Sequence, residues 1–350
     1  MIGRPLAELL AEKFRFIRSG CTLLDLALGG GWAKGRVANI IGDEQTGKTL
    51  LALIALANYQ RQYPDDDVNI HDAESTLDIR RAIKSFDIKV EGVGYDDEHQ
   101  TIGSLYTNLK SLLKKSKESF YLLDSLDAVS AVDVAEDDES DKDEPELGNM
   151  KAKLDKPALI SDLFSRLAGK LKKHGVTFFV ISQTRQKVGV MFGEKWTING
   201  GKSLAFYASQ RIKLAVVEKI KDKKKRTIGV WVKVQVIKNK MGEPFHEVSF
   251  PIYYDRGIDN VEACVEFLFE HSNAFGKKKS IEFNGHKFKS SSDLIDYFYE
   301  DKSARKELIR LTQEVWNKEI AIIDSTAEKE TSHKAEKEQK TEKQKGRKKK

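Results

Sequence analysis

One octapeptide constrains the fold of this 350-residue chain more than any other feature: Gly42, Asp43, Glu44, Gln45, Thr46, Gly47, Lys48 and Thr49. Its spacing, G-x-x-x-x-G-K-T, is typical of a loop whose backbone N–H groups bind phosphate. A β-prone run, Val37 to Ile41, precedes it, and a helix-prone run, Leu50 to Gln62, follows it. A chance match is expected about once in a hundred such chains. The sequence therefore predicts a nucleotide site in which Lys48 reaches the β and γ phosphates and the Thr49 hydroxyl ligates Mg²⁺.

Three further strands are expected, and a polar group follows each of them. Val68 to His71 leads into Asp72-Ala73-Glu74, Phe120 to Leu123 into Asp124, and Val176 to Ile181 into Ser182-Gln183. Helical segments lie between these runs, so the fold class is α/β with a mainly parallel sheet. The polar groups then meet at the carboxyl ends of the strands.

These strand ends carry candidate chemistry for the phosphates. Asp124 can hold the Mg²⁺ shell through water, with a cap on the next turn as the alternative. Glu74 can polarise the water that attacks the γ phosphate, or it can form a structural salt bridge. Gln183 can hydrogen-bond the γ phosphate and move when that group leaves. We interpret Lys48, Glu74 and Gln183 as catalytic groups and Thr49 and Asp124 as metal ligands.

The cysteine content and the N-terminus bear on the compartment. Cys21 and Cys264 provide neither a disulfide framework nor a metal cluster, and the N-terminus lacks the apolar run of a signal peptide or membrane span. We expect a cytoplasmic protein that does not contact a membrane.

Charge is segregated along the chain, although the net charge is +6. Residues 133–146 hold nine acids and one Lys, residues 219–226 hold six bases and one acid, and residues 325–350 hold ten bases and five acids. Such runs are most often solvated loops. Residues 324–350 are expected to form a disordered basic tail, either dispensable or able to bind nucleic-acid phosphates without sequence preference.

The stretch from residue 185 to residue 202 combines cations, aromatic groups and glycines. Its candidate nucleic-acid contacts are Arg185, Lys187, Phe192, Lys195, Trp196, Gly200, Gly201 and Lys202. This composition suits a mobile segment that follows phosphates and places apolar groups between bases. A core position for Met191 and Phe192 is the alternative.

Five longer blocks of the chain resemble the RecA recombinases. They are Ile70 to Asp78, Leu123 to Leu126, Val180 to Gly193, Gly200 to Ser209 and Val236 to Lys240. The resemblance extends from about Ser19 to Gly257, and its last three blocks separate it from other phosphate-loop ATPases. It implies an enzyme with a RecA-like ATPase core that uses ATP and Mg²⁺. Such an enzyme forms a helical filament on single-stranded DNA, searches a homologous duplex and exchanges strands.

The resemblance also implies residue roles. Glu74 resembles the catalytic glutamate, and Gln183 resembles the residue that reports the γ phosphate to a DNA-binding loop beginning near Arg185. Lys238 and Lys240 resemble the pair of cations that reach the ATP of the neighbouring subunit.

Three more positions match family contacts, and several others depart from them. Asp78 and Tyr254 resemble adenine contacts, and Phe206 resembles an interface residue. Arg81 stands where bacterial members have an adenine-stacking aromatic residue, and the acidic run at 133–146 occupies the region of the first DNA loop. The basic tail also differs from the acidic one of bacterial members. These departures suggest a phage-encoded relative.

Four segments are expected. Residues 1–18 form a short N-terminal arm for oligomerisation, with an amphipathic helix over 5–17 whose alternative role is packing on its own domain. Residues 19–258 form the ATPase core with its DNA-binding loops, residues 259–323 a small α+β domain, and residues 324–350 the tail.

The small domain has its own local signals. We expect a helix from Val261 to Phe269, a hairpin across Ile281 to Phe288 that turns at Asn284-Gly285, and two helices around Leu294 and Leu308.

Two rival functions share parts of this pattern. A hexameric DNA helicase has the same kind of core, but the block Lys238-Asn239-Lys240 argues against it. A non-enzymatic single-stranded DNA-binding protein would not need Lys48, Thr49, Glu74 and Asp124 together.

Overall fold

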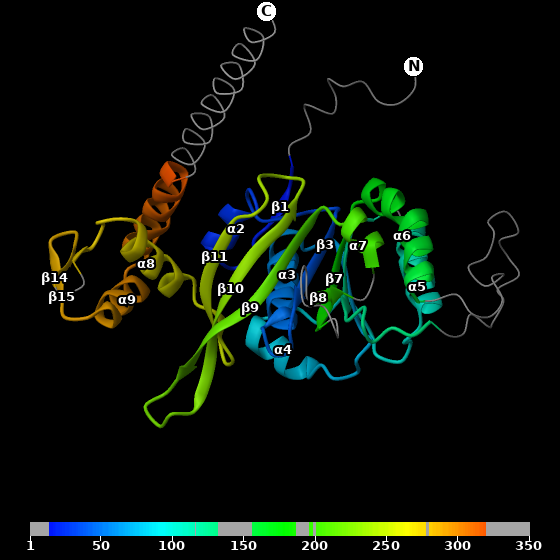
Figure 1. Cartoon of the computed structure of the whole chain (residues 1–350), viewed down its shortest axis with the longest axis horizontal. Coiled ribbons are helices and arrows are strands. Elements are labelled where there is room, and N and C mark those ends of the chain that lie inside the picture. Colours follow the sequence, from blue (N-terminus) through cyan, green and yellow to red (C-terminus); the bar gives the residue numbers. More distant parts are fainter. Residues whose placement is uncertain are drawn as a thin grey trace, which may run out of the picture. The chain divides into compact units, whose positions relative to one another are not determined.

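The computed structural model describes residues 14–115, 117–131, 156–186, 196–198, 201–277 and 280–319. The chain divides into two compact units, Met1–Asn260 and Val261–Lys350 (Figure 1). Among the described residues, no helix has both the length and the apolar character needed to cross a membrane.

A ten-stranded mixed sheet forms the frame of the first unit, with the order β12-β11-β10-β9-β3-β7-β6-β4-β5 and with β8 paired to β7. The neighbouring pairs from β9 to β5 are parallel. The remaining pairs are antiparallel: β9 with β10, β10 with β11, β11 with β12, and β7 with β8. The predicted α/β class with a mainly parallel sheet is confirmed.

The strands of this sheet are β3 (Val37–Gly42), β4 (Asp67–Asp72), β5 (Val93–Asp96), β6 (Ser119–Asp124), β7 (Val176–Gln186), β8 (Trp196–Ile198), β9 (Gln210–Lys221), β10 (Thr227–Asn239), β11 (Glu247–Tyr253) and β12 (Gly257–Ile258). The helices of this unit are α2 (Thr22–Ala27), α3 (Lys48–Gln62), α4 (Ile79–Phe86), α5 (Ile102–Lys114), α6 (Lys156–Lys173) and α7 (Gly201–Tyr207).

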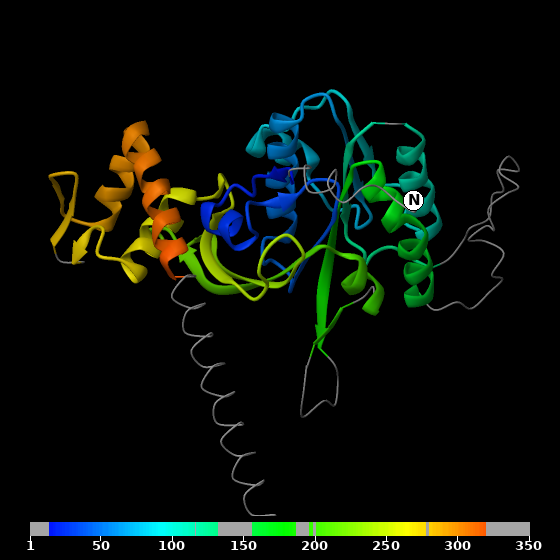
Figure 2. The same cartoon turned by 90° about the horizontal axis from the view of Figure 1, so that it is seen from above.

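Helices cover both faces of the parallel strands, which explains why these strands read as continuous apolar runs. Phe178 points to the side of α5 and α6, where it packs in one cluster with Leu109 and Phe164. Its neighbour Phe179 points to the opposite side, where its ring lies 4.7 Å from that of Phe120. Figure 2 shows α5 and α6 on one side of β7 and α3 on the other.

The predicted N-terminal helix over residues 5–17 is wrong at its end, and its first part, up to residue 13, lies outside the described residues. Phe16–Ile17 is a strand, β1, antiparallel to β2 (Trp32–Ala33). Ile17 and Trp32 are both fully buried. Burial against a distant partner outweighs the weak local preference for a helix.

The antiparallel strands β9, β10 and β11 were not predicted from the sequence. Only the block Val236 to Lys240, at the end of β10, was noted there, and it was noted for its resemblance to the family. The basic run at 219–226, read as a solvated loop, includes the end of β9 and the turn to β10. Pairing with β10 holds the end of β9 extended in this run.

The second unit follows its predicted order. It contains α8 (Asn260–His271, which begins at the last residue of the first unit), β13 (Gly276–Lys277), β14 (Ser280–Phe283), β15 (His286–Phe288), α9 (Ser291–Glu300) and a helical segment over 302–319. Asn284 and Gly285 have φ values of 50° and 78°, the left-handed pair that a two-residue hairpin turn requires. The predicted hairpin and helices are confirmed, and Phe275, Phe283 and Phe298 pack in their core.

Candidate nucleotide-binding site

The octapeptide forms a tight turn between β3 and α3. Gly47, the residue before α3, has φ 86°, a conformation that favours glycine. A Cβ atom on Gly47 would lie 2.9 Å from the Ile252 side chain, and one on Gly42 would lie 2.9 Å from the Leu214 carbonyl oxygen. Gly47, the N-cap of α3, has no side chain that could cap the start of the helix. The first backbone N–H groups of α3 therefore remain available to an anion.

A pocket of about 440 Å³ opens at this helix start. It is lined by Gln45, Gly47, Lys48, Thr49, Leu50, Val230, Ile252 and Tyr254. The polar end belongs to the phosphate loop, and the apolar wall comes from β10, β11 and the residue after β11. A phosphate group at the polar end would leave a nucleobase beside the apolar wall, so the pocket suits a nucleotide.

Of the two residues predicted to contact adenine, one lines this pocket and the other is connected to it indirectly. Tyr254 lines it directly. Asp78 caps α4 by accepting a hydrogen bond from the Arg81 N–H at 3.1 Å, and the Arg81 guanidinium donates to the Tyr254 carbonyl oxygen at 3.1 Å. Asp78 is therefore connected to the pocket through Arg81 and does not line it.

Lys48 and Thr49 lie at the polar end beside a buried carboxylate. The Lys48 ammonium donates to the Asp43 carbonyl oxygen at 2.6 Å, and burial lowers the pKa of Lys48. The Thr49 hydroxyl donates to Asp124 at 2.6 Å. Burial raises the pKa of Asp124 to about 6, and the negative charges of Glu74 and Asp72 add to this shift.

The pair Thr49 and Asp124 fits Mg²⁺ better than a metal that needs a full protein ligand set. In the described part of the chain, His, Cys, Asp and Glu side chains form no group of three or more that could hold a metal. Mg²⁺ takes oxygen ligands, keeps several waters and is commonly bound by one or two protein groups together with the phosphates.

Binding of Mg²⁺ with a nucleotide should weaken as the pH falls below about 6. Protonation of Asp124, whose pKa is raised to about 6, removes the charge that attracts the ion. Mg²⁺-dependent nucleotide binding measured from pH 7.5 to pH 5.5 checks this. The Asp124→Asn variant is the control. Its side chain does not titrate, so any pH dependence that it retains comes from titration of the nucleotide. Parallel pH profiles for the two proteins would show that Asp124 does not bind the ion.

Glu74 and Gln183 meet at the carboxyl-end edge of the sheet, from β4 and β7, the two strands that flank β6. The Glu74 carboxylate accepts hydrogen bonds from the Ser125 hydroxyl at 2.5 Å and from the Gln183 side-chain amide at 3.1 Å. Ser125 follows β6 and Gln183 lies within β7, whereas Glu74 follows β4. Two bonds to one oxygen fix the orientation of the carboxylate. The sequence predicted Glu74 and Gln183 as site residues but did not predict the contact between Ser125 and Glu74.

Asp72 and Tyr95, which the sequence did not single out, hold the turn that carries Glu74. Asp72 accepts hydrogen bonds from the Leu77 N–H at 2.9 Å and from the Tyr95 hydroxyl at 3.0 Å. The run Asp72-Ala73-Glu74 was a usable signal for Asp72. Tyr95 comes from β5, an edge strand without a recognisable pattern.

Gln183 also lies next to the phosphate loop. Its neighbour Thr184 donates a hydrogen bond to the side chain of Asp43, and Gln183 pairs with Gly42 in the β3–β7 register. The end of β7 therefore contacts both the loop and Glu74.

The predicted DNA-binding segment is described only at its two ends. Lys187, Phe192, Lys195 and Gly200 lie outside the described residues. The backbone of Arg185 pairs with Thr197, and that of Gln186 with Trp196, in the antiparallel β7–β8 pair. Gly201 begins α7, and Lys202 in that helix is exposed. The structure thus brings the two ends of the segment together beyond Gln183.

Lys238 and Lys240 lie at and just after the end of β10, and neither lines the 440 Å³ pocket of its own chain. The Lys238 ammonium donates to the carbonyl oxygens of Ala205 and Phe206 in α7, both at 2.7 Å. Burial, followed by the charges of Lys240 and Arg211, lowers the pKa of Lys238 to about 8. Lys240 is exposed, and the Phe206 side chain is 70% exposed.

The region that contains all of these residues has known relatives. Residues 5–259 match the family model of the RecA N-terminal domain. Protein RecA of Thermosynechococcus vestitus is 31% identical over 325 residues, which cover 92% of this chain and 87% of that protein. Protein RecA of Trichodesmium erythraeum is 33% identical over 278 residues, or 78% and 72% of the two chains. Protein RecA of Leptospira biflexa is 30% identical over 298 residues, or 84% and 72%. The expected phage origin stays a prediction.

Proposed function

The chain belongs to the RecA family of DNA-dependent ATPases, and on this premise we propose that it forms a filament on single-stranded DNA and exchanges strands with a homologous duplex. The observation that carries the proposal is the position of Gln183. Its side chain bonds to Glu74, and the backbone of its strand leads within two residues to Arg185, where the predicted DNA-binding segment begins. The end of β7 thus lies beside both Glu74 and the start of the predicted DNA-binding segment, which supports the proposal.

ATP binds in the pocket beside the phosphate loop. The N–H groups at the start of α3 and the Lys48 ammonium hold the β and γ phosphates. Thr49 and Asp124 would hold Mg²⁺, which neutralises developing charge on the phosphates when bound. Tyr254 borders the base, and Asp78 supports that border through Arg81.

Glu74 accepts the proton of the water that attacks the γ phosphate. Its bonds to Ser125 and Gln183 orient the carboxylate before ATP binds. A γ phosphate competes with Glu74 for the amide of Gln183, because that amide is a hydrogen-bond donor. Gln183 then shifts, and the shift passes along β7 to the DNA-binding segment.

The ATPase site is completed by the neighbouring subunit. Lys238 and Lys240 reach the phosphates of the adjacent protomer's ATP, which is consistent with their absence from the lining of their own pocket. Lys238 holds the carboxyl end of α7, where the exposed Phe206 lies, so the same contact links the nucleotide to the subunit interface.

Formation of joint molecules tests the proposed function. With ATP and single-stranded DNA, we expect the protein to pair the strand with a homologous supercoiled duplex and not with a heterologous one. The measurement is a D-loop assay with both duplexes. A hexameric helicase would instead unwind the duplex without forming joint molecules, and it would form closed rings in micrographs. Joint molecules with neither duplex would refute the proposal.

A further inference from the structure

Hydrogen bonding between β6 and β7 continues past the end of β6, which lies at Asp124. The Leu126 N–H donates to the Ile181 carbonyl oxygen at 3.0 Å. Further along β7 the bonding partner is a side chain, because the Asp127 carboxylate accepts a hydrogen bond from the Gln183 N–H at 2.7 Å. A carboxylate therefore takes the place that a backbone carbonyl oxygen has in a regular parallel pair.

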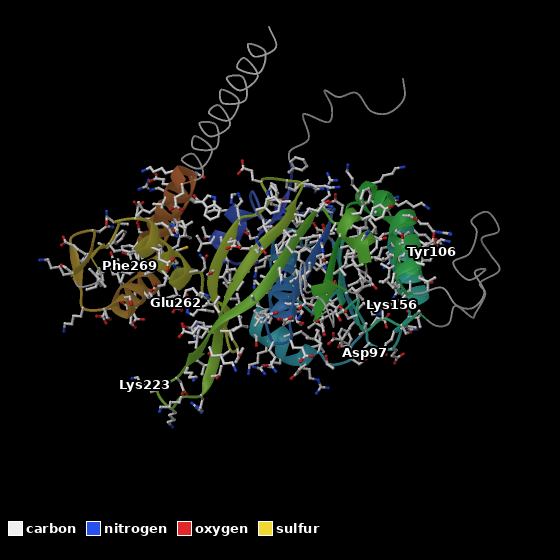
Figure 3. The ribbon with its side chains drawn as sticks, viewed as in Figure 1. Asp97, Tyr106, Lys156, Lys223, Glu262 and Phe269 are labelled. Atoms are coloured by element: carbon white, nitrogen blue, oxygen red, sulfur yellow. The ribbon has the colours of Figure 1, made fainter. Side chains whose placement is uncertain are left out.

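The turn that carries Asp127 is itself held on two sides. The carbonyl oxygen of Asp127 accepts a hydrogen bond from the Lys156 ammonium at 2.8 Å, and Lys156 is the first residue of α6 (Figure 3). The Ala128 N–H donates to the Ser125 carbonyl oxygen at 3.2 Å, which closes the turn on the side of β6. The position of Asp127 is thus fixed by α6 and β6, so it can serve as an anchor for β7.

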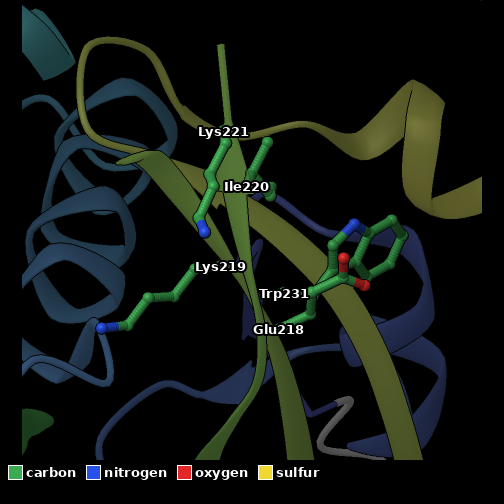
Figure 4. A pocket seen from close by; sticks show the side chains of 5 residues that line it. All are labelled: Glu218, Lys219, Ile220, Lys221 and Trp231. Carbon is green, nitrogen blue, oxygen red and sulfur yellow. The ribbon is translucent and has the colours of Figure 1, made fainter. Parts of the chain in front are cut away.

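Charged groups on the surface of the first unit have more open surroundings than Asp127. A hollow of about 550 Å³ on the β9–β10 hairpin is lined by Glu218, Lys219, Ile220, Lys221 and Trp231 (Figure 4). Its three charged residues are exposed. Asp127 is half-buried, and its carboxylate bonds to the backbone of a strand that enters the candidate site. A hydrogen bond to a charged acceptor is stronger than one to a neutral acceptor.

The end of β7 is held at three points around Gln183. Asp127 binds its backbone N–H, Glu74 accepts from its side-chain amide at 3.1 Å, and the hydroxyl of the next residue, Thr184, donates to the Asp43 side chain in the phosphate loop. In the proposed function, the bond to Glu74 is the one that a γ phosphate replaces. The backbone bond to Asp127 is then the fixed point about which the Gln183 side chain turns.

We propose that Asp127 is a positioning residue that couples ATP to DNA: by holding the backbone N–H of Gln183, it lets the γ phosphate and the DNA-binding segment affect each other through the end of β7. The inference deepens the proposed function and rests on it for the two ligands. Without the anchor, the backbone at Gln183 would absorb a displacement that starts at Arg185 or at the γ phosphate. Asp127 touches neither ligand in this role.

The charge of Asp127 has a separate effect, which the test must distinguish from the hydrogen bond. Burial lowers the pKa of Lys48, and the charges of Asp124, Glu74 and Asp127 oppose this shift, in that order of size. Loss of the Asp127 charge alone would therefore act on a phosphate ligand directly. Variants that separate the charge of the side chain from the position of its oxygen are needed.

The coupling between the two ligands tests the role of Asp127. The affinity for single-stranded DNA is measured with and without a slowly hydrolysed ATP analogue, and the ratio of the two affinities is the coupling. Nucleotide titrations with and without DNA must give the same ratio, because linkage is reciprocal, and ratios of about 5 to 150 are common. In Asp127→Ala the ratio should fall by roughly fivefold or more, toward 1. Binding of the analogue without DNA should stay close to that of the parent.

Two further variants and one control separate the bond from the charge. Asp127→Asn keeps an acceptor oxygen in place without the charge, so it should keep the parent ratio. Asp127→Glu keeps the charge but moves the oxygens by one methylene group, so it should lose coupling as Asp127→Ala does. The exposed Asp65 lies just before β4, at the opposite end of that strand from Glu74. Asp65→Ala removes the same charge and should keep the parent ratio.

Thermal unfolding shows whether Asp127→Ala is folded, and the comparison of the Asn and Glu variants decides the question if it is not. A parent-like ratio in a folded Asp127→Ala protein would overturn the assignment. Loss of coupling in Asp127→Asn would also overturn it, because the charge and not the bond would be responsible. Weaker binding of both ligands at an unchanged ratio would show a purely structural role. Failure of the proposed function is distinguishable, since the ATP analogue would then not affect DNA binding by the parent itself.

Discussion

Replacing Glu74 by Gln should lower ATP hydrolysis by about 10² to 10⁴-fold and leave ATP binding nearly unchanged. The amide keeps the size of the side chain but cannot accept the proton of the attacking water. Ser125 and Gln183 can still bond to its carbonyl oxygen, so the local structure should persist. Phosphate release in a single turnover, together with nucleotide titrations, measures the two effects separately.

Ser125→Ala is the matched control for Glu74→Gln. It removes one of the two bonds to the carboxylate and leaves the proton acceptor in place. We expect hydrolysis to fall less than in Glu74→Gln. If Glu74→Gln hydrolyses ATP at a near-normal rate, another group accepts the proton.

Replacing Lys48 by Ala should weaken ATP binding by about a hundredfold or more, because a buried ammonium makes strong hydrogen bonds to phosphate oxygens. The variant also loses the bond from Lys48 to the Asp43 carbonyl oxygen. Its thermal unfolding should therefore be recorded beside its nucleotide titration. The exposed Lys89, replaced by Ala, is the control and should bind ATP as the parent does. Normal ATP binding by a folded Lys48→Ala protein would contradict the assigned role of the loop.

Mixing two inactive variants extends this test to the subunit interface. Lys48→Ala and Lys240→Ala impair opposite sides of the proposed shared site. Some interfaces in a mixed filament then combine two intact halves, and part of the ATPase activity should return. Absence of recovery in filaments shown to contain both variants would argue against a role for Lys240 in the neighbour's site.

Local features of the chain were predictable because their geometry depends on neighbouring residues alone. The phosphate loop from Gly42 to Thr49 uses consecutive backbone N–H groups and a glycine at a left-handed position. The turn at Asn284-Gly285 likewise needs two residues that tolerate positive φ. The strand before the loop has an apolar pattern set by its burial on both faces.

The contacts around Glu74 could be anticipated only in part. Glu74 and Gln183 each follow or end an apolar strand, which identified both as site residues. The hydrogen bond between Glu74 and Gln183, and the one from Ser125 to Glu74, depend on the order β7-β6-β4 in the sheet. Strand order results from the packing of segments far apart in the sequence.

By itself, the sequence determined the family, the α/β class and the identity of the phosphate loop, since each depends on consecutive residues in a fixed spacing. The tertiary structure alone decided that Phe16–Ile17 is a strand and that the basic run at 219–226 ends a long hairpin. In both cases the local sequence permits another conformation. Pairing with Trp32–Ala33 buries Ile17, and pairing with β3 and β10 holds β9 extended. Such hydrogen bonds and burial depend on a partner strand outside the segment, so they have no signature within the segment itself, and they contribute more than local propensity.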